Sequence, residues 1–174
     1  MHRLTIDPNK LRFFHFSKND DFSSLDFRQY DGTDPLHVHK FIREEVSTYL
    51  DNHLGSIYSV RYEDELVAFF TLSMSCIGYS TKATIGDSYV ETKLYPALLI
   101  GKIGIDKAYR GRKIGQYICS FCSGIGQELN RYAACAFLVL RTTASLARRY
   151  YAPKFNFEWT AREEGNVWMY RKLF

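Results

Sequence analysis

The spacing of apolar residues changes along the chain, and the changes divide it into predicted helices and strands. Over residues 113–132 apolar side chains recur every three or four positions, which predicts an amphipathic helix. Shorter apolar runs, separated by polar or turn-forming residues, predict strands. These predicted strands cover residues 55–62, 66–77, 95–105, 135–142, 155–160 and 166–174.

Polar and proline residues between these runs predict where elements begin and end. The acidic residues 63–65 predict a hairpin turn between the first two strands. Asp34 and Pro35 form a helix-start signal, because Asp caps free backbone N–H groups and Pro fits the first helical turn. A short helix over residues 144–152 is expected to end before Pro153.

The order of the predicted elements indicates the fold class. A strand, turn, helix and strand follow one another over 95–142, which predicts a right-handed crossover joining two parallel strands in a mixed sheet. Residues 1–30 are expected to add one short strand, and residues 78–94 an irregular loop. We therefore expect an α/β (α+β) protein, and a length of 174 residues suits a single domain over 1–174.

Composition narrows the class of protein. Apolar residues make up 46% and charged residues 24%, which is ordinary for a soluble globular chain. No apolar run reaches the roughly 18 residues of a membrane span, and the N-terminal residues lack the apolar core of a secretory signal. Cys119 and Cys122 lie in one predicted helix without a second Cys pair, so core thiols are favoured over a metal site. We expect a cytoplasmic protein with reduced cysteines and no metal.

Basic residues and glycines gather where the strand over 95–105 meets the following helix. The net charge of +4 permits an anionic ligand without requiring one, but Arg110, Arg112 and Lys113 stand together at this junction. Helix N-termini present unpaired N–H groups to anions, and Gly111 and Gly115 leave the backbone open to approach. A pyrophosphate site and a solvated basic turn both fit these residues. The P-loop pattern is absent, and the dinucleotide-binding glycine pattern does not occur at this turn.

The pattern that does fit is R-x-x-G-x-G/A, and through it the chain resembles the GNAT acetyltransferases. The segment "LIGKIGIDKAYRGRKIGQYI", residues 99–118, is similar to the central strand, pyrophosphate loop and helix of that family. One position departs from the pattern, since Lys113 stands where the family usually has glycine. The lysine side chain can point to solvent there, so we expect binding to survive, and Lys113 could itself contact a phosphate.

The resemblance extends over about residues 27–173. "FRQYDGTDPLHVHKFIREEVSTYL" resembles the first helical region of a subgroup that includes the tRNA-acetylating toxins of toxin–antitoxin pairs. "SLARRYYAPKFNFE" resembles the late A-x-x-F-Y-x-x-x-G-F segment, whose Tyr acts as general acid in the family. Alignment places that role on Tyr151. An extra residue near Pro153, and Asn156 in place of glycine, leave Tyr150 as an alternative.

The resemblance implies a fold, a co-substrate and a site. The fold would be a mixed, mostly antiparallel central sheet with splayed parallel central strands and flanking helices. Acetyl-CoA would be the co-substrate, and the backbones of Ile103, Gly104 and Ile105 would pair with its pantetheine arm. Its pyrophosphate would be held by Arg110, Gly111, Arg112, Lys113, Ile114, Gly115 and Gln116. A neutral amine would attack the thioester directly, and a Tyr hydroxyl could protonate the leaving thiolate because the two groups have similar basicity.

The sequence does not identify the acceptor amine. Aminoacyl-tRNA fits the subgroup resemblance, and a small amine or a protein amine fits equally well. A non-catalytic acyl-CoA sensor of the same fold is the alternative from another class. Among partners, tRNA, an antitoxin and a second copy of the chain all stay open, whereas a membrane is not expected. Glu91, His37 and His39 are candidate general bases only because they can accept a proton.

Overall fold

Two compact units make up the chain, and each combines two separate stretches of sequence. The structure is a computed structural model that describes residues 6–78, 94–163 and 165–174. Unit 1 comprises Met1–Ser73 and Gly101–Ser120, and unit 2 comprises Met74–Ile100 and Phe121–Phe174. Three elements run through both units: β3 (Glu65–Gly78), β4 (Leu94–Ile105) and α3 (Ile114–Leu129).

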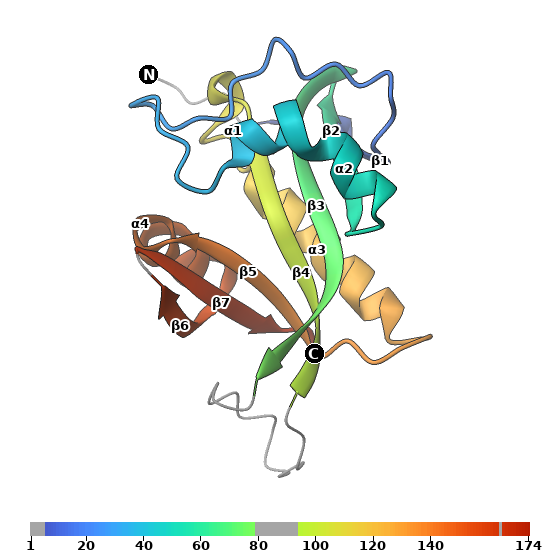
Figure 1. The fold of residues 1–174 in the computed structure, drawn as a ribbon, viewed down its shortest axis with the longest axis vertical. Helices are drawn as coiled ribbons and strands as arrows, with labels where there is room; N and C mark the ends of the chain where they lie inside the picture. Colours follow the sequence, from blue (N-terminus) through green and yellow to red (C-terminus); the bar gives the residue numbers. More distant parts are fainter. Residues whose placement is uncertain (1–5, 79–93, 164) are drawn as a thin grey trace. The chain divides into compact units, whose positions relative to one another are not determined.

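The described strands form one mixed sheet of seven strands in the order β1-β2-β3-β4-β5-β7-β6. β4 and β5 are parallel, whereas β1–β2, β2–β3, β5–β7 and β6–β7 are antiparallel. The parallel strands are central in this order and are linked through α3 (Figure 1). The predicted mixed sheet with a parallel crossover is confirmed.

In unit 1, β1 (Leu11–His15) and β2 (Ser56–Tyr62) pair beside the first part of β3. The turn between β2 and β3 consists of Glu63 and Asp64, with φ of 50° and 71°. Two residues with positive φ form a hairpin turn of type I′, whose twist matches that of the flanking strands. Two short 3₁₀ helices complete the unit, η1 (Pro8–Lys10) and η3 (Lys107–Tyr109).

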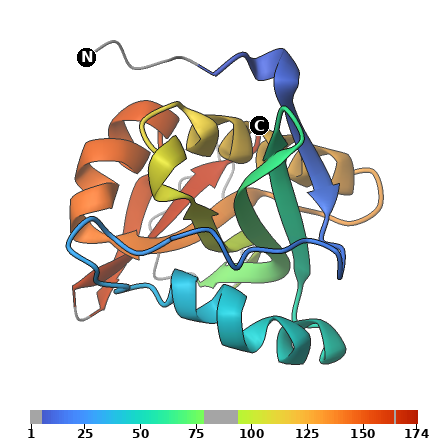
Figure 2. The same ribbon diagram turned by 90° about the horizontal axis from the view of Figure 1, so that it is seen from above.

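A helical segment covers one face of these strands in unit 1. It comprises α1 (Val38–Lys40), the π-helical turn η2 (Phe41–Glu45) and α2 (Val46–Asp51). Figure 2 shows this segment and the first turns of α3 on opposite faces of the strands of unit 1. The segment packs on a buried, mostly aromatic cluster around Phe69, which has no exposed surface. The cluster consists of Phe22, Phe27, Val38, Phe41, Ile42, Ile57 and Phe69.

In unit 2, β5 (Phe137–Thr143), β7 (Asn166–Lys172) and β6 (Glu158–Glu163) follow one another in the sheet. A second helical segment connects β5 to β6 and consists of α4 (Ala144–Leu146), the π-helical turn η4 (Ala147–Tyr151) and α5 (Ala152–Phe155) (Figure 1). The buried cluster of this unit comprises Ile77, Tyr95, Ala97, Phe137, Val139 and Tyr170.

Two predicted helix boundaries are wrong. The first helix begins at Val38, not beside Asp34, although the Asp34 carboxylate still accepts the N–H groups of Val38 at 2.8 Å and Lys40 at 3.0 Å. The helix over 144–152 does not end before Pro153 but continues to Phe155. Proline lacks an N–H and crowds the carbonyl four residues earlier, and the wider π-helical turn just before it accommodates both effects.

Several predicted strands are confirmed. The hairpin over 55–77, the short strand within 1–30 and the closing hairpin are present, and α3 ends three residues before the predicted boundary. The predicted loop over 78–94 falls mainly on residues 79–93, outside the described residues. Cys119 and Cys122 are buried, as expected of core thiols.

Among the described residues, no helix has the length and apolar character needed to cross a membrane. The same part of the chain contains no group of three or more His, Cys, Asp or Glu that could hold a metal ion.

Candidate active site

The loop between β4 and α3 has two left-handed backbone positions directly before the helix. Gly111 has a φ of 78° and Lys113 a φ of 67°, and α3 begins at Ile114. The Lys113 carbonyl accepts the N–H groups of Gln116 at 2.9 Å and Tyr117 at 3.3 Å, so it starts the helical hydrogen bonding. The first N–H groups of a helix lack partners within it and carry the positive end of its dipole. This 16-residue helix therefore offers an anion a favourable end.

Lys113 occupies the position where the GNAT pattern has glycine, and its backbone gives a physical reason for that pattern. A φ of 67° lies in the left-handed region, which a residue with a Cβ atom adopts at a cost of about 1–2 kcal/mol. The chain keeps the backbone conformation that glycine would adopt freely. It also adds an exposed cation next to the helix N-terminus.

Asp106 organises the start of the loop from a buried position. One carboxylate oxygen accepts the Ala108 N–H at 2.9 Å, and the other accepts the Asp26 N–H at 2.8 Å. The Lys107 N–H donates to the Asp26 carbonyl at 3.0 Å, and the Lys107 ammonium contacts the Asp26 carboxylate at 2.8 Å. These bonds join the loop to residues 26–30, which we call the brace segment.

Arg110 also connects the loop to the brace segment. Its guanidinium donates to the Ile105 carbonyl at 3.0 Å and to the Phe27 carbonyl at 2.7 Å, and it lies 5.6 Å from the centre of the Tyr30 ring. The Arg110 side chain thus holds two backbone carbonyls in place, and its predicted contact with a bound pyrophosphate stays a prediction.

Arg112 lies over a tyrosine of the same loop. Its guanidinium is 4.9 Å from the centre of the Tyr109 ring, and the Tyr109 hydroxyl donates a hydrogen bond to the Glu65 carboxylate. This hydrogen bond, together with burial, raises the pKa of Tyr109 to about 12. Tyr109 therefore stays protonated at neutral pH and fixes the loop against β3.

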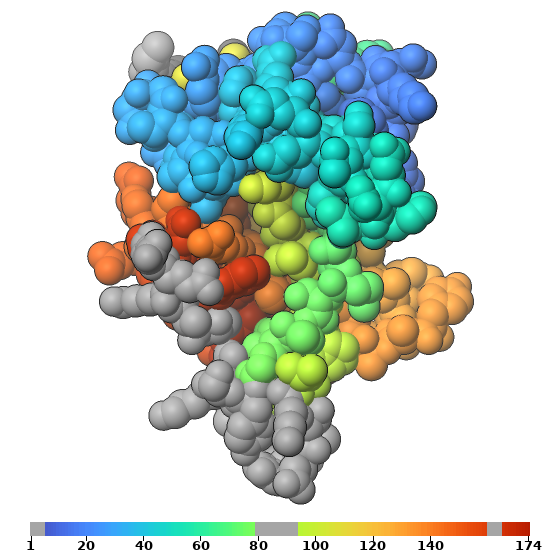
Figure 3. Space-filling model, in the orientation of Figure 1, coloured from blue at the N-terminus to red at the C-terminus, as the bar shows by residue number. Residues whose placement is uncertain are grey.

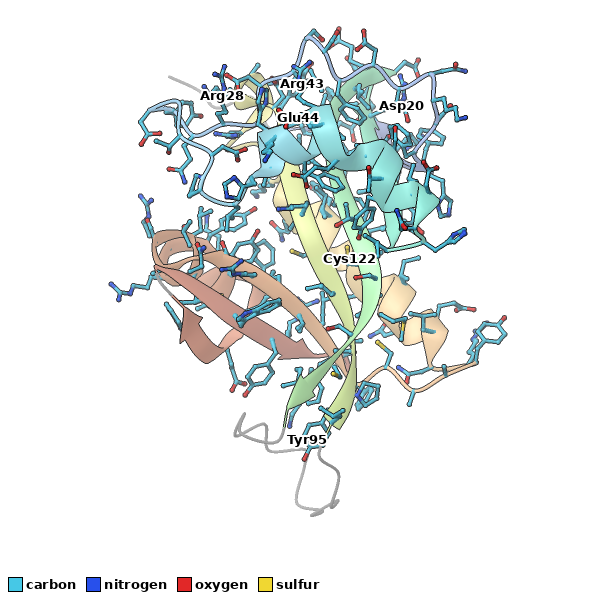
Figure 4. All side chains as sticks on the ribbon, viewed as in Figure 1. Asp20, Arg28, Arg43, Glu44, Tyr95 and Cys122 are labelled. Atoms are coloured by element: carbon cyan, nitrogen blue, oxygen red, sulfur yellow. The ribbon has the colours of Figure 1, made fainter. Side chains whose placement is uncertain are left out.

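Two arginines contact residues 23–26, at and just before the start of the brace segment. Arg28 makes a two-pronged contact with the Asp26 carboxylate at 2.9 and 3.0 Å, and with Lys107 it holds the pKa of Asp26 well below its usual range. Arg43, on η2, donates to the carbonyls of Ser23 at 2.7 Å and Leu25 at 3.1 Å (Figure 4). In Figure 3 residues from this N-terminal stretch, in blue, form a continuous surface with the helical segment of unit 1, in cyan.

The predicted pantetheine-binding residues lie in the last part of β4, beyond its parallel ladder. That ladder joins Ala97–Ile100 to Phe137–Leu140, whereas β4 continues to Ile105. Ile103 and Ile105 are half-buried and Gly104 is buried. A Cβ atom on Gly104 would lie 2.3 Å from the Phe69 ring, so this close approach requires glycine.

Tyr150 and Tyr151, the two candidate acids, both lie in the π-helical turn η4. Tyr151 is buried, with 9% of its surface exposed, whereas Tyr150 is half-buried. The Tyr151 ring lies 5.9 Å from the Phe157 ring and 6.2 Å from the Phe155 ring. Tyr150 packs at 5.0 Å on Phe155, and its ring lies 5.2 Å from the Lys154 ammonium. A π-helical turn is uncommon in proteins and is often found at functional sites.

Asn156 is the second position where the chain departs from a glycine of the GNAT pattern. Its φ is 54°, and it caps the C-terminal end of α5. Asn tolerates this conformation better than most residues with a Cβ atom. Both departures, Lys113 and Asn156, thus fall on left-handed backbone.

A further feature of unit 2 is a buried hydroxyl on β5 that lacks a hydrogen-bond partner among the described residues. Among the described residues, the Thr142 Oγ1 atom is buried without a hydrogen-bond partner, and Thr142 is 1% exposed. Thr142 lies two residues beyond the last parallel pair, Ile100 with Leu140.

The structure gathers the predicted loop residues and Ile103–Ile105 in unit 1 and places Tyr151 in unit 2.

Sequence reasoning missed Asp26, Asp106 and the brace segment. Asp106 carried a signal, since an Asp directly after a strand commonly caps the next turn. Asp26 carried none, because its partner Asp106 is 80 positions away. Of the candidate bases, His39 is half-buried against Phe27, His37 is exposed, and Glu91 lies outside the described residues.

Comparisons with known proteins connect this geometry to a fold. No family model and no curated protein sequence matches the chain. Solved structures do match, among them a bacterial toxin with a TM-score of 0.77 and 12% identity, covering 94% of this chain and 90% of that one. AtaT in complex with acetyl-methionyl-tRNAfMet matches with a TM-score of 0.77 and 13% identity over 93% of this chain and 94% of AtaT. AtaTR bound with AcCoA matches with a TM-score of 0.72 and 14% identity, covering 95% of each chain. The chain therefore has a GNAT-like fold that matches these structures over 93–95% of its length.

Proposed function

We propose that this GNAT-like protein is an N-acetyltransferase that uses acetyl-CoA to acetylate the amine of an aminoacyl-tRNA. The observation that carries the proposal is the loop at the start of α3. There, left-handed backbone at Gly111 and Lys113 leads directly into a helix N-terminus, at the place where the GNAT pattern binds pyrophosphate. The acceptor rests on the match with AtaT, whose structure contains acetyl-methionyl-tRNAfMet.

In the proposed complex the loop binds the pyrophosphate through its backbone and through one exposed cation. The N–H groups of residues 111–116 and the dipole of α3 attract the phosphates, and the Lys113 ammonium adds charge. Arg110 and Asp106 keep the loop in shape through the brace segment. The backbone of Ile103–Ile105 pairs with the pantetheine arm in the manner of an added strand, because β4 continues beyond its ladder with β5.

The chemical step requires little of the protein beyond orientation and one proton. The neutral amine attacks the thioester carbonyl, the new C–N bond forms, the C–S bond breaks, and the amine releases a proton to water. Tyr151 gives its phenolic proton to the departing thiolate and regains one from solvent. Proton transfer of this kind contributes about 10²–10⁴-fold to the rate.

Acetyl transfer from labelled acetyl-CoA to charged tRNA tests the proposal, with uncharged tRNA, a small amine and a lysine peptide as competing acceptors. We expect label on charged tRNA and an about 10²–10⁴-fold lower kcat for Tyr151→Phe. Tyr150→Phe is the matched control, since it removes a hydroxyl from the adjacent residue of the same turn and should leave kcat nearly unchanged. Loss of activity in Tyr150→Phe alone would transfer the acid role to Tyr150.

The same assay separates the alternatives. Label on a small amine or a peptide, and none on charged tRNA, would change the acceptor but keep the chemistry. Acetyl-CoA binding in a calorimetric titration, without transfer to any acceptor, would indicate a sensor. No binding at all would refute the coenzyme site.

A further inference from the structure

Arg171, on β7, connects three parts of unit 2 through one guanidinium group. It donates to the Ser123 hydroxyl on α3 and to the Phe155 carbonyl at 3.2 Å, and it lies 5.4 Å from the centre of the Phe157 ring. Its backbone is fixed by strand pairing with Leu138 of β5. A planar guanidinium can donate in two directions and lie against a ring at once, which a lysine ammonium cannot do.

These contacts lie where the helical segment of unit 2 ends. Phe155 is the last residue of α5, so its carbonyl is one of those that helix geometry leaves without an intrahelical partner. A cation at the C-terminal end of a helix also interacts favourably with the helix dipole. Asn156 follows in the left-handed conformation and leads to Phe157, whose ring lies beside the same arginine. Arg171 thus fixes the chain on both sides of Asn156.

Both phenylalanines at this corner pack near Tyr151. Their rings lie 6.2 Å and 5.9 Å from the Tyr151 ring, and the Phe157 N–H donates to the Tyr151 carbonyl at 3.3 Å. A shift of Phe155 would therefore disturb the packing of the Tyr151 ring, and a shift of Phe157 would disturb both its ring and its backbone.

We propose that Arg171 is a positioning residue for the Tyr151 hydroxyl and acts through Phe155 and Phe157. This inference rests on the proposed function of Tyr151 as the acid. It predicts a specific kinetic effect, because a misplaced proton donor slows the chemical step without changing how the pyrophosphate loop, which belongs to unit 1, binds acetyl-CoA.

A double-mutant cycle on the full chain tests the inference. Arg171→Met should lower kcat about 10–100-fold and leave the KM for acetyl-CoA within about twofold. In the Tyr151→Phe background the same substitution should lower kcat no further, because the group that it positions is already gone. Arg171→Lys should recover only part of the loss, since it keeps the charge but not the planar geometry.

Arg131→Met is the matched control. Arg131 is an exposed arginine of unit 2 that pairs with Glu128, and its loss should leave kcat unchanged. If Arg171→Met does not fold, Ser123→Ala removes one partner of the guanidinium and supplies a milder version of the same cycle.

The outcomes separate the inference from the function on which it rests. An equal loss of kcat in both backgrounds, or a loss carried by the KM for acetyl-CoA, would overturn the positioning role while leaving Tyr151 as the acid. Full activity in Tyr151→Phe would overturn both the positioning role and the acid role, and an inactive parent protein would overturn the acetyltransferase itself. A kcat loss that disappears in the Tyr151→Phe background would establish the inference.

Discussion

Replacing Lys113 by glycine should stabilise the protein, although the substitution removes a side chain. Lys113 has a φ of 67°, and the left-handed conformation costs a residue with a Cβ atom about 1–2 kcal/mol. Glycine avoids that cost but gains freedom in the unfolded chain, which offsets about 0.5–1 kcal/mol. The net gain over a residue with a Cβ atom is therefore about 0–1.5 kcal/mol, with a central value of about 0.75 kcal/mol. For a chain of this length the central value corresponds to about 1.5–3 °C in melting temperature.

Lys113→Ala is the control that separates the cost of the left-handed backbone from the loss of the ammonium group. It removes the same ammonium as Lys113→Gly but keeps the Cβ atom. Thermal unfolding of the parent and both variants should give the highest melting temperature for the glycine variant and similar values for the other two. Calorimetric titration with acetyl-CoA should show equal weakening in both variants if the ammonium contacts a phosphate. Equal melting temperatures for the glycine and alanine variants would refute the reasoning from backbone strain.

Three further predictions concern groups described above. Gly104→Ala should destabilise the protein by about 1–3 kcal/mol, because the new Cβ atom would lie 2.3 Å from the Phe69 ring. Gly124→Ala should stabilise it by about 0.5–1 kcal/mol, because a Cβ atom on this helical glycine would enter open space. Urea denaturation measures both. Thr142→Val should raise the melting temperature by about 2–4 °C, because it replaces a buried hydroxyl without a partner by a methyl group. Asp26→Asn should reduce the loss of stability between about pH 5 and pH 2, measured by thermal unfolding. The lowered pKa of Asp26 makes its contribution fully present above the ordinary carboxyl pKa, and the contribution is lost as the pH falls below that value toward the pKa in the folded protein.

Each of these predictions has an outcome that contradicts it. Equal free energies of unfolding for Gly104→Ala and Gly124→Ala would mean that the Phe69 ring moves aside without cost. A lower melting temperature for Thr142→Val would mean that the hydroxyl has a partner in solution. An unchanged acid transition in Asp26→Asn would mean that the contacts of Asp26 with Arg28 and Lys107 do not persist in solution.

Sequence reasoning located the elements that short-range patterns determine. The period of α3 and the acidic turn at Glu63 and Asp64 are both local signals, and both led to the observed structure. The continuation of the helix past Pro153 was missed because a π-helical turn has no periodic signature of its own. The start at Val38 was missed because the Asp34 carboxylate reaches forward across a turn to its N–H partners.

The candidate site was also only partly predictable from the sequence. The position of the loop was predictable from the glycines and cations around residue 110, but the role of its side chains was not. Arg110 binds the carbonyl of Phe27, 83 positions away, and no local pattern connects these two residues. The backbone conformation of Lys113 was equally hidden, because lysine gives no sign of a left-handed position and only the likeness to a glycine pattern suggested one.

The arrangement of the two units has a consequence for synthesis on the ribosome. Unit 1 cannot close until residues 101–120 have emerged, although its first 73 residues are made long before. At about 5–20 residues per second, the intervening residues 74–100 delay it by roughly 1–5 s. During that interval the apolar centre of β3, including Phe69 and Phe70, lacks β4 as a neighbour. Pauses in translation between residues 74 and 120 should therefore lower the yield of folded protein more than pauses elsewhere.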